Sequence, residues 1–120
     1  MKIAISSQGK GLDDKVDPRF GRAPFFVIVD PETSEFTSVS NDQNLSLPQG
    51  AGIQAAQNVI NQGVSAVLTG NCGPKAFKTL MAAKVGVYVD VAGTIREVLE
   101  RFKSGALVKS DDANVEGHWM

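Results

Sequence analysis

The sequence predicts one α/β domain in which helices pack on a five-stranded mixed sheet. Three observations lead to this prediction. The chain has 120 residues, 42% of them hydrophobic and 21% charged, which are ordinary values for a single globular domain. Short apolar segments come first along the chain, and apolar segments then alternate with helical patterns. No internal repeat and no linker divides the chain.

The first part of the chain predicts a strand, a long loop and a hairpin. The apolar segment from Lys2 to Ser7 is typical of a buried strand. Residues 8–20 are rich in glycine and aspartate and contain a proline, so they predict a loop. The segments Phe25 to Asp30 and Phe36 to Ser40 predict two further strands. The turn from Pro31 to Ser34 joins them, so we expect an antiparallel hairpin.

The second part of the chain alternates helical patterns with short apolar segments. Those segments predict strands at Val64 to Thr69 and at Val85 to Val91. Apolar positions at helical spacing predict three helices, which contain Ile53 to Ile60, Ala76 to Ala83 and Ile95 to Phe102. The second of these helices follows a proline, which suits a first helical turn.

The last helix has the clearest start signal. Thr94 followed by Glu97 forms a capping-box pattern, and the helix should end before Gly105. We expect the domain to cover residues 1–109 and a polar C-terminal tail to cover residues 110–120.

The resulting order, βββαβαβα, predicts a ribonuclease-H-like arrangement. Right-handed crossovers should place the first, fourth and fifth strands parallel. If the first and fourth strands are neighbours, the loop 8–20 lies beside the loop Gly70 to Pro74. Open α/β sheets bind ligands at such an edge, so we expect the functional site there.

Charge and composition exclude several classes of function. Twelve basic and thirteen acidic residues give a net charge of -1, so the chain lacks the broad positive field that nucleic-acid binding needs. The opening strand turns polar at Ser6, so we expect no signal peptide, no membrane span and a cytoplasmic location.

The sequence does not predict an enzyme. A metal-dependent nuclease would need an acidic residue on the first strand, and we expect Asp13, Asp14 and Asp17 to be solvated on a loop instead. Cys72 is the single cysteine, and His118, in the tail, is the single histidine. Neither a zinc site nor a Ser-His-Asp triad is therefore expected.

Glycine-rich loops at the predicted edge could hold an anion. Gly21, Gly70 and Gly73 would let backbone N–H groups approach it closely, and the start of a helix near Pro74 would add a partial positive charge. The alternative is that these glycines simply make turns.

Side chains of the same loops suit a bulky, soft anion. Arg19 and Arg22 flank an aromatic ring and a glycine, although each arginine could instead pair with a surface carboxylate. Lys75 could face solvent or a ligand. Cys72 lies on a strand-to-helix loop, which favours exposure and a thiolate, although a free cysteine is commonly a small buried hydrophobe.

These segments resemble the dinitrogenase iron-molybdenum cofactor biosynthesis family over nearly the whole chain. Residues 19–24, Arg-Phe-Gly-Arg-Ala-Pro, are similar to its most recognisable motif, and Thr69 to Pro74 are similar to its second. The resemblance implies a ribonuclease-H-like fold that carries metal clusters without catalysis: iron-molybdenum cofactor precursors in some members and a molybdenum-copper sulfide cluster in another. Many members have histidine where this chain has Arg19, which cannot ligate a metal but can neutralise a sulfide-capped anion.

We therefore expect a carrier that holds an anionic metal-sulfide cluster, molybdenum-copper sulfide or a related cluster, without a full set of protein ligands. Proteins that donate or receive the cluster would be its partners. Phe20 would shield the cluster, and Cys72 would add one metal bond or none. The expected binding residues are Arg19, Phe20, Gly21, Arg22, Asn71, Cys72, Gly73 and Lys75. Two alternatives stay open: a module that binds a phosphorylated metabolite or nucleotide through the same amides, and a domain that only docks a partner.

Overall fold

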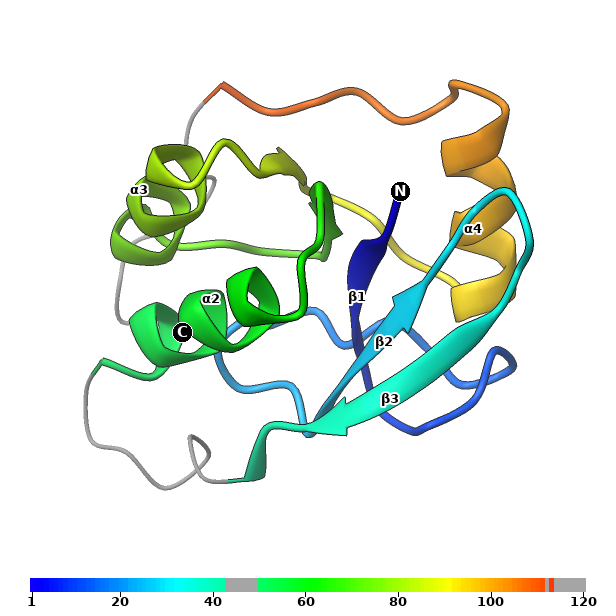
Figure 1. Ribbon diagram of the computed structural model, residues 1–120, viewed down its shortest axis with the longest axis horizontal. Helices are drawn as coiled ribbons and strands as arrows, with labels where there is room; N and C mark the ends of the chain where they lie inside the picture. The colour runs from blue at the N-terminus through cyan, green and yellow to red at the C-terminus, as the bar shows by residue number, and fades with distance from the viewer. Residues whose placement is uncertain (43–49, 112, 114–120) are drawn as a thin grey trace.

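A five-stranded mixed sheet with the order β3-β2-β1-β4-β5 forms the centre of the computed structural model (Figure 1). The structure describes residues 1–42, 50–111 and 113. The strands are β1 (Ile3–Ser7), β2 (Phe25–Val29), β3 (Phe36–Ser40), β4 (Ala66–Leu68) and β5 (Gly86–Tyr88). The described helices are α2 (Ala51–Asn61), α3 (Pro74–Ala82) and α4 (Ile95–Lys103). The predicted order of elements is confirmed.

The sheet is mixed because β1 has an antiparallel neighbour on one side and a parallel neighbour on the other. β1 pairs antiparallel with β2, where Ile3 lies opposite Val29, and parallel with β4, where Ile3 lies opposite Ala66. β2 and β3 form the antiparallel hairpin, and β4 and β5 pair in parallel. The first and fourth strands are therefore neighbours, as the prediction of the site requires.

Helices cover both faces of the sheet. Figure 1 shows α2 and α3 on one face and α4 on the other. On β1, Ala4 packs in the core beneath α2 and α3, whereas Ile3 and Ile5 pack in the core beneath α4. Successive residues of a strand point to opposite faces, so a strand with a core on each side has a continuous apolar sequence.

The capping box of α4 is present. The Glu97 N–H donates to Thr94 Oγ1 at 3.1 Å, and the Thr94 N–H donates to Glu97 Oε1 at 2.8 Å. This reciprocal pair satisfies two N–H groups at the start of the helix, so local sequence is sufficient to begin α4 at its predicted position.

Both β4 and β5 are shorter than predicted. Beyond Tyr88 the backbone turns, because Asp90 has a left-handed conformation with φ of 61°. The Asp90 N–H then donates to the Gly70 carbonyl at 2.8 Å, and the Val91 N–H to the Thr69 carbonyl at 3.1 Å. At the carboxyl ends, the residues predicted to extend these strands, Thr69 and Val89 to Val91, instead belong to the loops that follow them.

The chain beyond α4 returns to the sheet. The Ser110 N–H donates to the Val87 carbonyl at 2.7 Å, and Ala113 packs against the core beneath α2 and α3. The domain boundary at residue 109 stays a prediction, and His118 lies outside the described residues. Among the helices of the described residues, none is both long and apolar enough to cross a bilayer.

Candidate functional site

Two loops meet at the carboxyl ends of β1 and β4. Arg19 and Asn71 form an isolated parallel bridge, and the Phe20 N–H donates to the Asn71 carbonyl at 3.1 Å. The Arg22 N–H donates to the Arg19 carbonyl at 3.3 Å, which folds residues 19–22 into a turn. The structure therefore joins the arginine-bearing turn to the loop that leads into α3, as predicted.

Gly70 allows the two loops to approach closely. A Cβ atom at this position would lie 2.7 Å from Pro18 Cα and 2.9 Å from the Pro18 carbonyl oxygen. Contacts this short with backbone cannot be relieved by rotating a side chain. The glycine is therefore required for the approach, which is more than the turn that the sequence alone suggested.

Buried hydroxyl groups lie beneath the junction. Ser6 Oγ is 2.7 Å from Thr69 Oγ1 and donates to the Asp17 carbonyl at 2.8 Å, and the Asp17 N–H donates back to the Ser6 carbonyl at 2.9 Å. Ser6 and Thr69 are both 0% exposed. These contacts tie the ends of β1 and β4 to the first loop. This role was not predicted from the sequence, in which the signal is the change from apolar to hydroxyl residues at the ends of both strands.

Asp17 is buried, so the expectation that it is solvated is wrong. Its side chain accepts a hydrogen bond from the Arg19 N–H at 2.9 Å, and the residue is only 6% exposed. Burial raises the pKa of Asp17, while the Arg19 N–H and the Arg19 charge partly oppose the rise. The carboxyl group fixes the start of the turn that carries Arg19.

Asn41 holds the other side of this turn. Its Nδ2 donates to the Ala23 carbonyl at 2.9 Å and to the Gly21 carbonyl at 3.3 Å, and the residue is fully buried. No role was predicted for Asn41 from the sequence. Its position directly after a predicted strand was the only available signal.

Phe20 does not offer an aromatic face to a ligand. It is 0% exposed and its ring centroid lies 5.2 Å from that of Phe26 in the core beneath α2 and α3. The prediction that the Phe20 ring shields a bound cluster is therefore wrong. Burial of an aromatic ring contributes more to stability than exposure at a loop, so Phe20 anchors the turn between the two arginines.

Cys72 is also buried, which contradicts the expected exposure and the expected thiolate. Its Sγ lies 3.8 Å from the Gly73 carbonyl oxygen, and burial raises the pKa of the thiol to about 12. Desolvation of the charged form thus outweighs the partial positive charge at the start of α3. A bond from Cys72 to a metal stays a prediction, and it would require this loop to open.

The cationic residues stay accessible. Arg19 and Lys75 are exposed and Arg22 is half-buried. Lys75 follows Pro74 in the first turn of α3, where N–H groups have no partner within the helix. Gly73, which precedes the helix, is buried, and Asn71 is half-buried. Three cationic residues therefore lie on the two adjoining segments, beside the start of a helix, and a helix start favours an anion.

Protein metal ligands are scarce around this site. Among the residues that the structure describes, no group of three or more His, Cys, Asp or Glu side chains could hold a metal ion. The arrangement can neutralise and hydrogen-bond an anion, and it does not offer a set of donor atoms for a bare ion.

Comparison with known proteins agrees with the resemblance of the sequence. The family described as dinitrogenase iron-molybdenum cofactor matches residues 1–105. An uncharacterised protein of Methanocaldococcus jannaschii is 31% identical over 111 residues, which are 91% of this chain and 91% of that protein.

Solved structures show the same fold over almost the whole chain. The apo form of the orange protein from Desulfovibrio gigas is 43% identical with a TM-score of 0.93, and the match covers 95% of this chain and 96% of that one. A Thermotoga protein described as a NifB protein of the DUF35 family is 35% identical with a TM-score of 0.82, and the match covers 97% and 98% of the two chains. The protein belongs to the dinitrogenase iron-molybdenum cofactor family.

Proposed function

We propose that this protein binds and carries a pre-formed, anionic metal-sulfide cluster where the 19–22 turn meets the 69–73 loop. The backbone bridge between Arg19 and Asn71 carries the proposal. It brings the turn that bears both arginines to the segment that begins α3, so that cations and main-chain dipoles converge from two parts of the chain. Family membership supports binding of a cofactor at this fold.

Electrostatics and hydrogen bonds would hold the cluster. The charge of a sulfide-capped cluster is spread over several soft atoms, and a planar guanidinium group matches such a surface better than a compact ammonium does. Arg19 and Arg22 would contact it from one loop, and Lys75 and the first N–H groups of α3 from the other.

The cluster would bring its own sulfide ligands. Cys72 is buried with a raised pKa, and the described residues offer no other group of ligands. Binding would therefore be outer-sphere, with Cys72 adding no bond unless the loop opens. Such a protein would store or deliver a cluster and would not catalyse a reaction.

Family membership suggests which cluster the protein would bind. A molybdenum-copper sulfide cluster or an iron-molybdenum cofactor precursor would fit a site with this positive charge. The partners would be proteins that donate or receive the cluster. The cytoplasmic location and the ribonuclease-H-like description of the fold also stay predictions.

A titration of the apo protein with tetrathiomolybdate and copper(I), followed by visible absorption, tests the proposal. Arg19→Ala or Arg22→Ala should weaken retention about tenfold each, because a charge-assisted contact contributes about 1.5 kcal/mol or more. Cys72→Ser should retain the cluster nearly as well as wild type. Lys78→Ala is the matched control, since it removes an exposed charge from α3 one turn beyond the site.

Equal retention by wild type and both arginine variants would contradict the proposal, as would loss of the cluster in Cys72→Ser alone. Circular dichroism of each apo variant would confirm that it folds. The same titration with ATP tests the alternative of a nucleotide site, because ATP binding that competes with the cluster and depends on Arg22 would favour a general anion site.

A further inference from the structure

β3 is an edge strand, and no strand of the described residues pairs with its outer side. It pairs with β2 over five consecutive residues, from Phe36 opposite Val29 to Ser40 opposite Phe25, without a bulge. The Asp30 N–H donates to the Glu35 carbonyl at 2.9 Å, so the hydrogen-bonded pairs of this ladder include Glu35 and every second residue after it. The N–H and C=O groups of Phe36, Ser38 and Ser40 therefore point away from the sheet.

The two edges of the sheet differ. At the other edge the Ser110 N–H donates to the Val87 carbonyl, so a later segment of the chain contacts the outer side of β5. The sequence of β3, Phe-Thr-Ser-Val-Ser, contains no proline and no charged residue, which are two of the features that protect sheet edges. Phe36 is 42% exposed on this strand. An edge of this kind is suited to β-strand addition by another chain.

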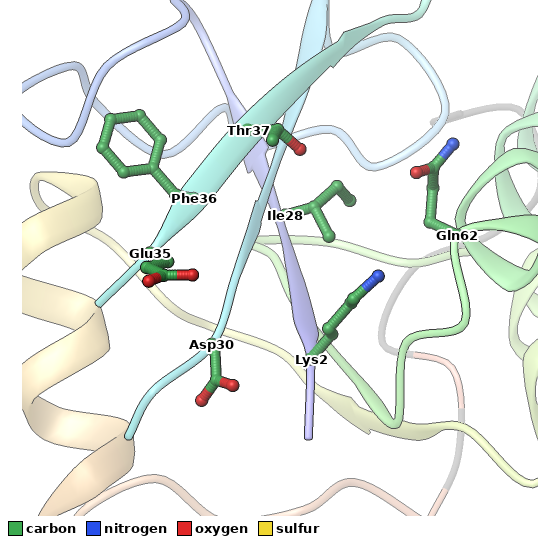
Figure 2. Close-up of a pocket in the computed structure, with 7 residues that line it drawn as sticks. All are labelled: Lys2, Ile28, Asp30, Glu35, Phe36, Thr37 and Gln62. Atoms are coloured by element: carbon green, nitrogen blue, oxygen red, sulfur yellow. The ribbon is translucent and has the colours of Figure 1, made fainter. Parts of the chain in front are cut away.

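A pocket of about 280 Å³ lies against this edge (Figure 2). Ile28 supplies an apolar wall. Figure 2 shows Asp30 just after the end of β2, Glu35 just before the start of β3, and the Lys2 side chain extending toward the side where Ile28 and Gln62 lie. The lining contains two carboxylates and one ammonium group, and among the described residues no ion pair joins them. Its residues are Lys2, Ile28, Asp30, Glu35, Phe36, Thr37 and Gln62.

We propose that β3 and this pocket together dock an extended, basic segment of a partner protein. The segment would add a sixth strand beside β3 through the outward groups of Phe36, Ser38 and Ser40. One Lys or Arg side chain would enter the pocket, with its aliphatic stem over Ile28 and its charge near Asp30 and Glu35. In strand addition of this kind, main-chain hydrogen bonds supply affinity and the pocket supplies specificity.

Charge favours a different chain over a second copy as the occupant. If two copies paired antiparallel through β3 about Ser38, neither strand would bring a basic residue to the pocket of the other, because β3 has none. A basic partner segment instead complements the excess of carboxylates. The docking site does not rest on the cluster site, since Lys2 precedes β1 whereas the cluster loops follow the other end of that strand.

Amide NMR on ¹⁵N-labelled protein tests the proposal with a defined probe. The probe is a seven-residue peptide that alternates Thr and Val around a central Arg, and its control carries Glu at the centre. The amide shifts of Phe36, Ser38 and Ser40 should exceed those of Thr37 and Val39, because only the outward N–H groups gain partners. The Arg peptide should bind about fivefold more tightly than the Glu peptide, which corresponds to a difference in binding free energy of roughly 1 kcal/mol.

Variants of Ser38 separate docking from folding. Ser38→Pro removes an outward N–H and leaves the β2 ladder intact, and proline is tolerated at such edge positions. It should abolish the shifts while the remainder of the spectrum stays folded. Ser38→Ala retains the N–H and should bind like wild type. Glu35→Gln should reduce the preference for the Arg peptide.

Three results of the peptide experiments would overturn the proposal. They are the absence of residue-specific shifts at millimolar peptide, equal binding of the Arg and Glu peptides, and unchanged binding by Ser38→Pro. Sedimentation of the free protein is the fourth check. A concentration-dependent dimer that shifts the amides of Phe36, Ser38 and Ser40 would assign this edge to a second copy and also overturn it.

Discussion

Asp17 shows how one buried side chain organises the candidate site. Its carboxylate accepts the Arg19 N–H, and its backbone is bonded to Ser6 in both directions. The position of Arg19 therefore depends on the Asp17 carboxylate, which would repel a bound anion. Arg19 offsets part of the cost of burying this carboxylate, which shows that the arginine has a structural partner as well as a proposed ligand.

Asp17 also gives a prediction about pH. Burial raises the pKa of Asp17 above its ordinary value of 3.8. At pH values between 3.8 and the raised pKa, the folded protein therefore binds a proton that the unfolded chain has lost. The free energy of unfolding falls as the pH rises through this range. Asp17→Asn should therefore match or exceed wild type at pH 7, and its advantage should shrink as the pH falls toward 3.8. Urea unfolding at several pH values measures the difference.

Two substitutions serve as controls for this prediction. Asp17→Ala leaves the Arg19 N–H without its acceptor and should destabilise the protein by about 1–3 kcal/mol at pH 7. Asp13→Asn changes an exposed carboxylate and should have little effect. An advantage of Asp17→Asn that grows as the pH falls would contradict the assignment.

At the scale of an element, α4 is specified by its own sequence. Thr94 and Glu97 cap each other, and hydrogen bonds from Thr94 lower the pKa of Glu97. The lowered pKa means that the contribution of Glu97 is present above its ordinary pKa of 4.5 and is lost as the pH falls through the lower folded value. α4 also contacts loop residues near the site, since the Ile95 N–H donates to the Asp14 carbonyl at 2.9 Å.

Removal of the cap should weaken this element measurably. Thr94→Ala should lower the free energy of unfolding by about 1 kcal/mol, because an N–H in the first turn loses its acceptor. Thr94→Ser retains the hydroxyl and should cost much less. Urea unfolding followed by circular dichroism compares the two, and equal stabilities would show that the cap contributes nothing.

At the scale of the whole molecule, one sheet is shared by two cores. β1, β2 and β4 each contribute residues to both faces, so neither core can be lost without disrupting the strands of the other. Cooperative unfolding follows from this shared sheet. The candidate site lies at the carboxyl ends of β1 and β4, whereas the proposed docking edge lies on the outer strand β3, so the two proposals do not depend on each other.

Scanning calorimetry should therefore show one transition. For 120 residues the unfolding enthalpy near 60 °C should be about 80 kcal/mol, equal to the van't Hoff value. Leu99→Ala, on the α4 face, should lower the midpoint of the whole transition by about 10 °C, because a cavity in either core destabilises the shared sheet. A second transition that moves separately would contradict a single unit.

Sequence alone determined the elements and their order, because periodicity, turn residues and caps act over a few neighbouring positions, as Thr94 and Glu97 illustrate. It also located the loops of the candidate site. Only the tertiary structure decided which side chains those loops expose: it buries Phe20, Cys72 and Asp17 and leaves Arg19 accessible. These outcomes depend on contacts such as Ser6 with Thr69, 63 residues apart, which no local pattern encodes because they form only when β1 and β4 pair.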